Sequence, residues 1–160
     1  MRRRPIITLS GGFDPLHVGH VRMIEQAAAY GDVVVILNSD EWLKRKKGFV
    51  FMTWAQRCEI LDALESVYLI MGVDDSDDTV CSALRDLHPD YFGNGGDRTR
   101  ENTPEREVCR ELGIEQVYEL GGGKIESSSS LLYKAMSRIV AENTCNVCWE
   151  PSCKNPNGKH

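Results

Sequence analysis

The amino-acid sequence predicts an α/β fold: a Rossmann-like, five-stranded parallel sheet with helices on both faces and a short Cys-rich C-terminal tail. Two observations lead to this prediction. The run Val33-Val34-Val35-Ile36-Leu37 is continuous and β-branched, which is typical of a strand buried on both faces of a parallel sheet. Short apolar runs also alternate with stretches of helical periodicity along the chain, which is the order of repeated βαβ units.

The first βαβ unit is the clearest part of the pattern. Residues 6–9 are expected to form the first strand, and residues 21–30 the first helix, which ends at Gly31 before the 33–37 strand. Further strands are expected at 67–71, 90–92 and 116–120, and further helices after Thr53, over 79–87, over 103–112 and from 127–130 to 140. The acidic loop 74–78 lacks the spacing of a calcium loop and is expected to cap the helix that follows.

Length and composition fit one compact domain with a small appendage, since the chain has 160 residues, of which 41% are hydrophobic. The net charge of −5 argues against a nucleic-acid partner. No stretch approaches the roughly 20 apolar residues that cross a membrane. No signal-peptide pattern follows the basic N-terminus, so we expect a cytoplasmic protein whose Cys58, Cys81 and Cys109 are reduced.

The segment Gly11-Gly12-Phe13-Asp14-Pro15-Leu16-His17-Val18-Gly19-His20, here called the signature, lies between the first strand and the first helix. Its glycines permit a sharp turn and a close approach of the backbone to a ligand. Its two histidines stand at a helix start, where unpaired N–H groups and the helix dipole favour an anion. A helix cap with a surface imidazole is one alternative. A metal pair is another, but zinc takes three or four protein ligands and only Asp14 adjoins. The pattern favours phosphate chemistry.

Two further segments point to phosphate. Lys44-Arg45-Lys46-Lys47-Gly48 is either a solvated surface run or a mobile loop that clamps a triphosphate. Its place after the carboxyl end of a strand favours the clamp, because ligands of open α/β sheets bind there. The serines at 127–130 are either a linker or a phosphate cradle, since only one of them is needed as a helix cap.

The signature resembles that of the cytidylyltransferase-like nucleotidyltransferases, and the resemblance extends over roughly residues 6–140. It implies transfer of a nucleoside monophosphate from ATP or CTP to a small phosphorylated acceptor, a sugar phosphate or a polyol phosphate, with release of pyrophosphate. Residues 38–48 are similar to heptose-1-phosphate adenylyltransferases and, more loosely, to glycerol-3-phosphate cytidylyltransferase. Asn94 replaces a lysine common in the heptose enzymes, and the Arg-Thr-x-Gly of the glycerol enzyme is missing, so base and acceptor stay open.

The resemblance also implies site residues and partners. Arg57 would bind the acceptor; a surface ion pair is the alternative, since a cation in the first turn opposes the helix dipole. The implied partners are the nucleoside triphosphate with Mg²⁺, the acceptor and a second copy in a homodimer. A non-catalytic nucleotide sensor is the competing class, but a pure binder has no need of cations for a leaving group. The implied catalytic residues are His17, His20, Lys44 and Lys47, and the implied nucleotide-binding residues are Gly11, Gly12, Phe13, Asp14, Gly95, Gly96, Asp97, Ser128, Ser129 and Ser130.

The C-terminal residues form a separate pattern. We expect a nucleotidyltransferase domain at 1–142 and a Cys-rich tail at 143–160. Three thiols and an imidazole suit tetrahedral zinc as a structural clip, and a disordered tail with incidental cysteines is the alternative. The candidate zinc ligands are Cys145, Cys148, Cys153 and His160.

Overall fold

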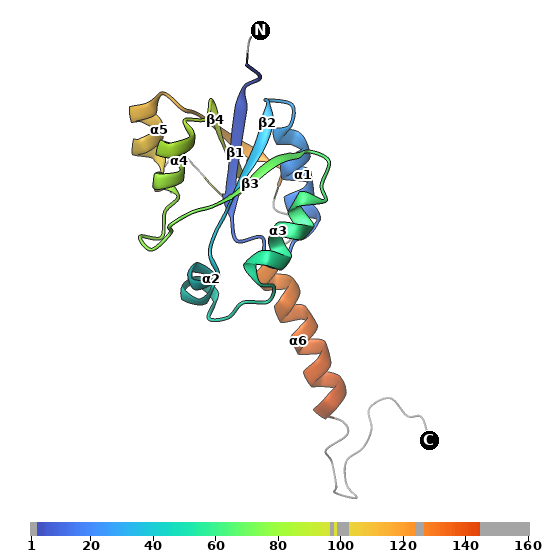
Figure 1. Ribbon diagram of the computed structural model, residues 1–160. Helices are drawn as coiled ribbons and strands as arrows, with labels where there is room; N and C mark the ends of the chain where they lie inside the picture. The colour runs from blue at the N-terminus through green and yellow to red at the C-terminus, as the bar shows by residue number, and fades with distance from the viewer. Residues whose placement is uncertain (1–2, 97, 99–102, 124–126, 145–160) are drawn as a thin grey trace, which may run out of the picture. The chain divides into compact units, whose positions relative to one another are not determined.

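The computed structural model describes residues 3–96, 98, 103–123 and 127–144 (Figure 1). The strands are β1 (Ile6–Gly11), β2 (Asp32–Leu37), β3 (Val67–Gly72), β4 (Tyr91–Gly95) and β5 (Glu115–Leu120). The helices are α1 (Val18–Ala27), α2 (Asp40–Lys47), α3 (Trp54–Asp62), α4 (Cys81–Leu87), α5 (Arg106–Leu112) and α6 (Ser128–Thr144).

The five strands form one parallel sheet in the order β3-β2-β1-β4-β5, which confirms the predicted fold. The central strand β1 pairs with β2 along its whole length and with β4 at residues 7–9. The order of the strands reverses at β1, because the chain proceeds outward through β2 and β3 and then returns to β4. Ligands of open α/β sheets bind at the carboxyl ends of the strands beside such a reversal. The signature begins at that edge.

A hydrophobic core lies on each face of the sheet, with α1 and α3 covering one face and α4 and α5 the other (Figure 1). Ile24 of α1 and Leu61 of α3 belong to the first core, and Leu84 of α4 belongs to the second. β2 contributes to both cores, since Val35 packs in the first and Ile36 in the second. This two-sided burial explains the continuous apolar run of β2.

The cationic run lies on helix α2, so the prediction of a mobile loop was wrong. The Ser39 side chain accepts a hydrogen bond from the Trp42 N–H at 3.0 Å and caps the helix start. Gly48 ends the helix in the left-handed conformation, with φ 83°. Acids in the first turn and four cations in the last turn match the helix dipole. The capping residues and the order of charges therefore make a helix of this segment.

Three other predictions about local structure were also wrong. The strand expected at 90–92 is longer, because β4 continues to Gly95. Gly93 is needed inside the strand, since a Cβ there would lie 2.6 Å from side-chain atoms of Leu9 and Leu120. Helix α5 begins at Arg106 rather than directly after Thr103, and α4 has no side-chain cap from the acidic loop.

The chain divides into two compact units, Met1–Ser128 and Ser129–His160. The sheet, the first five helices and the signature belong to the first unit, and nearly all of α6 belongs to the second. No helix in the described ranges is long and apolar enough to span a lipid bilayer. The predicted zinc ligands Cys145, Cys148, Cys153 and His160, and the predicted nucleotide-binding Asp97, lie outside the described residues.

Candidate functional site at the carboxyl edge of the sheet

The signature turns tightly at the end of β1, against helix α2. A Cβ on Gly12 would lie 2.7 Å from Leu43 Cδ2, so glycine allows α2 to pack directly on the turn. Phe13 adopts a left-handed backbone conformation, with φ 49°, and its buried ring lies 4.9 Å from the His20 ring between centroids. Such strained residues are found where surrounding packing holds them, often at functional sites.

The two signature histidines lie side by side at the start of α1. His17 is the N-cap, and its Nδ1 accepts a hydrogen bond from the Gly19 N–H at 3.1 Å. The Nδ1 of His20 accepts a hydrogen bond from the His17 N–H at 3.3 Å. The rings stack with centroids 3.8 Å apart. A Cβ on Gly19 would lie 3.0 Å from His17 Cε1, so glycine at this position makes room for the ring.

These contacts decide which nitrogen carries the proton. A neutral imidazole whose Nδ1 accepts a hydrogen bond carries its hydrogen on Nε2. Burial, together with smaller electrostatic effects of His17 and Lys47, lowers the pKa of His20 to about 3. His20 is therefore neutral at pH 7 and is a hydrogen-bond donor through Nε2. The capping and phosphate-binding interpretations are compatible, because they use different nitrogens.

Among the described contacts of the α2 cations, Lys47 is the one that contacts the signature. Its Nζ donates a hydrogen bond to the Asp14 carbonyl oxygen at 2.7 Å. Burial lowers the pKa of Lys47, the Asp14 carboxylate partly offsets this, and the charge of Arg57 lowers the pKa again. A half-buried ammonium beside two imidazole donors is suited to bind an anion.

The other cations of α2 make different contacts. Arg45 and Lys46 pair with Asp78, at 3.2 and 3.1 Å. The hydrogen bond from Lys46 is the main reason why the pKa of Asp78 is low. Lys44 is exposed, and its Nζ lies 3.9 Å from Glu41 Oε1. Of the two lysines predicted to be catalytic, the structure therefore joins Lys47 to the signature and leaves Lys44 at the surface.

Asp75 was missed by the sequence analysis and supports the start of α2. Its buried carboxylate accepts hydrogen bonds from Asn38 Nδ2 at 3.0 Å and from the N–H and Oγ of Ser39 at 2.8 and 2.7 Å. Burial alone would raise the pKa of Asp75, but these hydrogen bonds and the charge of Arg45 lower it overall. The sequence contained one sign of this role. An acidic loop follows the carboxyl end of β3, and a cationic segment follows β2, so parallel strands place the two charged segments at the same edge of the sheet.

Arg57 is buried in the described structure, and its guanidinium contacts protein groups. It donates hydrogen bonds to the carbonyl oxygens of Met52 at 3.0 Å, Gly12 at 2.7 Å and Asn38 at 3.0 Å. It also pairs with the Asp40 carboxylate at 2.6 Å. These contacts explain a cation in the first turn of α3. The predicted acceptor-binding role stays a prediction, and the ion pair with an acid is internal rather than at the surface.

Other predicted residues lie near the signature. Ser128 Oγ donates a hydrogen bond to the Pro15 carbonyl oxygen at 2.9 Å. Gly95 ends β4, the strand that pairs with β1, and Gly96 follows it in a turn. Gly11 ends β1. Ser129 and Ser130 belong to the second unit.

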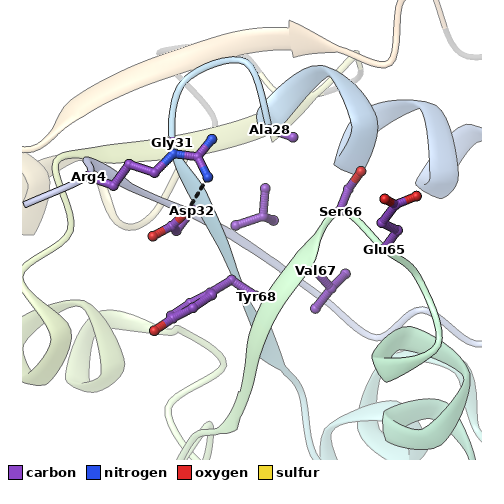
Figure 2. Close-up of a pocket in the computed structure, with 9 residues that line it drawn as sticks. Arg4, Ala28, Gly31, Asp32, Glu65, Ser66, Val67 and Tyr68 are labelled. Carbon is purple, nitrogen blue, oxygen red and sulfur yellow. Dashed lines mark hydrogen bonds and ion pairs between the residues drawn. The ribbon is translucent and has the colours of Figure 1, made fainter.

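A pocket at the opposite edge of the sheet is poorly suited to phosphate (Figure 2). It lies where β2 and β3 begin, and its lining includes the carboxylates of Asp32 and Glu65. Its cation, Arg4, pairs with Asp32 at 2.9 Å. Within the described ranges, no group of three or more His, Cys, Asp or Glu side chains is placed to hold a metal ion. The metal-pair alternative for the signature histidines thus finds no third ligand there.

The parallel sheet with helices on both faces defines a Rossmann-like protein, and His17, His20 and Lys47 mark a candidate phosphate-binding site at its carboxyl edge. The chain belongs to the cytidylyltransferase-like family, whose sequence profile matches residues 8–136. This confirms the family resemblance of the signature.

Individual relatives show the same likeness. The chain is 34% identical to the "Bifunctional protein HldE" of Geotalea uraniireducens over 142 residues, which cover 87% of this chain and 27% of that protein. It is 40% identical to the protein of the same name from Hyphomonas neptunium over 111 residues, covering 68% of this chain and 22% of that protein. The chain thus spans about a quarter of the length of these relatives. The fold is similar to that of a lipopolysaccharide core biosynthesis protein from Thermoplasma volcanium, with a TM-score of 0.63, 18% identity, and coverage of 73% of this chain and 97% of that one.

Proposed function

We propose that this protein is a nucleotidyltransferase that transfers a nucleoside monophosphate from ATP or CTP to a small phosphorylated acceptor and releases pyrophosphate. The observation that carries the proposal is the stacked pair His17 and His20, with Nδ1 engaged in the helix cap and the hydrogen on Nε2, next to Lys47. Membership of the cytidylyltransferase-like family supports it. The resemblance of residues 38–48 to heptose-1-phosphate adenylyltransferases favours a sugar phosphate as acceptor and ATP as donor.

The proposed reaction is an in-line displacement. An acceptor phosphate oxygen attacks the α-phosphorus, the bond from that phosphorus to the bridging oxygen breaks, and pyrophosphate leaves with the electron pair. The triphosphate is the substrate as its magnesium complex. The protein aligns the groups and stabilises developing charge. The Nε2–H groups of His17 and His20 donate to phosphate oxygens, and Lys47 binds the leaving pyrophosphate.

Other residues supply binding rather than chemistry in this proposal. Exposed Lys44 attracts the triphosphate, and Ser128 receives its terminal phosphates. The roles of Ser129 and Ser130 in nucleotide binding stay predictions. Backbone groups of Gly11, Gly12 and Phe13 approach the nucleotide closely.

The test is pyrophosphate release with magnesium, measured for the four ribonucleoside triphosphates against sugar, polyol and amino-alcohol phosphates. We expect release with one triphosphate and one class of acceptor, which also decides between adenylyl and cytidylyl transfer. Tight triphosphate binding without release across the panel would favour the nucleotide sensor instead.

A histidine variant tests the role of Nε2. In His20→Asn the amide oxygen replaces Nδ1 as the acceptor of the cap, while the Nε2 donor is lost. We expect turnover to fall by about 10²–10³-fold, as when one charge-stabilising donor is removed from an active site. His88→Asn is the matched control, because His88 is exposed and ends α4 in a left-handed conformation that asparagine tolerates. Near-normal turnover of His20→Asn would contradict the assignment.

We also propose that Cys145, Cys148, Cys153 and His160 hold a structural zinc ion, because three thiolates and an imidazole form a donor set typical of such sites. Native mass spectrometry should find one zinc ion per chain, which is lost in Cys148→Ser. Protein prepared with zinc present that carries none would contradict this. The homodimer and the cytoplasmic location stay predictions.

A further inference from the structure

Residues 38–53, here called the lysine segment, include helix α2 and form a loop whose two ends lie close together. Arg57 contacts both ends of the segment. At its start, the guanidinium donates to the Asn38 carbonyl oxygen at 3.0 Å and pairs with Asp40 at 2.6 Å. At its end, the same group donates to the Met52 carbonyl oxygen at 3.0 Å. Arg57 therefore closes the base of a surface loop whose ends lie close together.

Arg57 also joins this base to the signature. Its Nη1 donates to the Gly12 carbonyl oxygen at 2.7 Å. The side chain is entirely buried, so each of these contacts replaces water. A planar guanidinium presents its donors in a fixed fork, which lysine cannot reproduce. One side chain thus sets the distance between the phosphate-binding turn and the segment that carries the cations.

Asp14 joins the same two parts from the signature side. Its buried carboxylate accepts hydrogen bonds from the N–H groups of Phe51 at 2.8 Å and Met52 at 2.7 Å. Its carbonyl oxygen accepts the hydrogen bond from Lys47 Nζ at 2.7 Å. The side chain and the main-chain carbonyl group of Asp14 therefore both bind the lysine segment.

We propose that Asp14 and Arg57 are positioning residues that hold the lysine segment on the signature and thereby place Lys47 beside His17 and His20. Every hydrogen bond given above for the two side chains ends on the signature or on the lysine segment. Among the described residues, neither side chain bonds to a strand of the sheet beyond these two parts. Their removal should first displace the lysine segment, and with it Lys47. The functional meaning of this placement rests on the proposed function.

The proposal assigns Asp14 and Arg57 a role different from direct ligand contact. Asp14 is an anion and would repel a triphosphate if it faced one, whereas here its charge is used by two backbone amides. Arg57 has four protein acceptors. The charged groups that act on Lys47 are Asp14 and Arg57, and the neutral imidazole of His20 is affected by the charge of Lys47. Lys47 therefore stands between the two positioning residues and the histidine pair.

The first measurement is amide hydrogen exchange of Asp14→Asn and Arg57→Lys. We expect exchange of the Phe51 and Met52 amides to rise at least about tenfold, while the amides of β1 and β2 keep their protection. Glu111→Gln is the control for loss of one negative charge, because Glu111 forms an exposed ion pair with Arg85. Unchanged exchange at Phe51 and Met52 would overturn the proposal.

The second measurement is a double-mutant cycle on the dissociation constant of inorganic tripolyphosphate, measured by calorimetry. Asp14→Asn should weaken binding about tenfold when Lys47 is present and less than about twofold in a Lys47→Met background, because its effect passes through Lys47. An equal loss in both backgrounds indicates general structural damage and overturns the proposal. A wild-type chain that does not bind tripolyphosphate would refute the phosphate site, and amide exchange would then decide the placement of the segment alone.

Discussion

The imidazoles of His17 and His20 perform two tasks with two ring nitrogens. Nδ1 accepts a backbone hydrogen bond at the start of α1, which is the task of any capping side chain. In His20, Nε2 is left with the hydrogen, which makes this nitrogen a donor. Asparagine or serine would satisfy the same backbone groups but would have no second nitrogen at that distance. The residue type at these positions is thus explained by the donor and not by the cap.

The lowered pKa of His20 makes the stability of the protein depend on pH. The ordinary pKa of 6.5 applies to the unfolded chain and falls to about 3 in the folded protein, mainly through burial. As the pH falls, His20 therefore binds a proton in the unfolded state before it does so in the folded state. Its contribution to the free energy of unfolding is fully present above pH 6.5 and is lost as the pH falls toward 3. We expect the free energy of unfolding to fall more between pH 7 and about pH 4.5 in the wild type than in His20→Asn. Urea denaturation at both pH values measures this, and equal losses would contradict it.

Helix α2 is short, and its two ends determine whether it forms. It has one buried apolar residue, Leu43, so packing alone gives little support. Ser39 caps its start, and Gly48 ends it in a conformation that other residues adopt only with strain. The position of Lys47, one residue before Gly48, depends on this ending.

Replacement of Gly48 by alanine should therefore affect both stability and phosphate binding. A Cβ at Gly48 meets nothing within 4 Å, so the cost is conformational and amounts to about 1 kcal/mol. Gly113→Ala is a matched control, because Gly113 has φ 68°, is equally unobstructed and ends α5. We expect both variants to lose similar stability in urea denaturation, but only Gly48→Ala to bind tripolyphosphate more weakly. Equal affinities would show that Lys47 is placed without this helix end.

Most elements of the fold could be predicted from local patterns, and α2 shows where such patterns fail. The buried strand β2 is a continuous apolar run, and α1 has helical periodicity. α2 has no apolar stripe, and only its capping residues and its order of charges marked it. Apart from the hydrogen bond of Arg57 to nearby Met52, the contacts of Arg57 and Asp75 were also hidden, because they join residues 17 to 45 positions apart. No local sequence pattern records such pairs.

The whole first unit is built around β1, which lies between the two cores and carries the signature at its end. The net charge of the chain is −5, yet the carboxyl edge of the sheet presents Lys47, the neutral imidazole of His20 and the imidazole of His17. Acids that would oppose an anion there are engaged, since Asp14 binds backbone amides and Asp78 binds Arg45 and Lys46. Under the proposed function, attraction of a phosphate would thus be a local property of this edge.

A buried thiol on the sheet face that α4 and α5 cover can report whether the carboxyl edge, with the signature, unfolds together with the rest of the first unit. Cys109 of α5 lies in the core that α4 and α5 cover, and burial is the main reason why the pKa of its thiol is raised to about 11. Because the thiolate is the reactive form, iodoacetamide at pH 8 should modify half-buried Cys58 and Cys81 before Cys109. A ligand that binds only the folded state lowers the opened fraction, so tripolyphosphate at 100 times its dissociation constant should slow labelling of Cys109 about 100-fold. Peptide mass spectrometry resolves each site. Unchanged labelling of Cys109 at that concentration would instead mean that the α4–α5 face opens without disrupting the edge that binds phosphate.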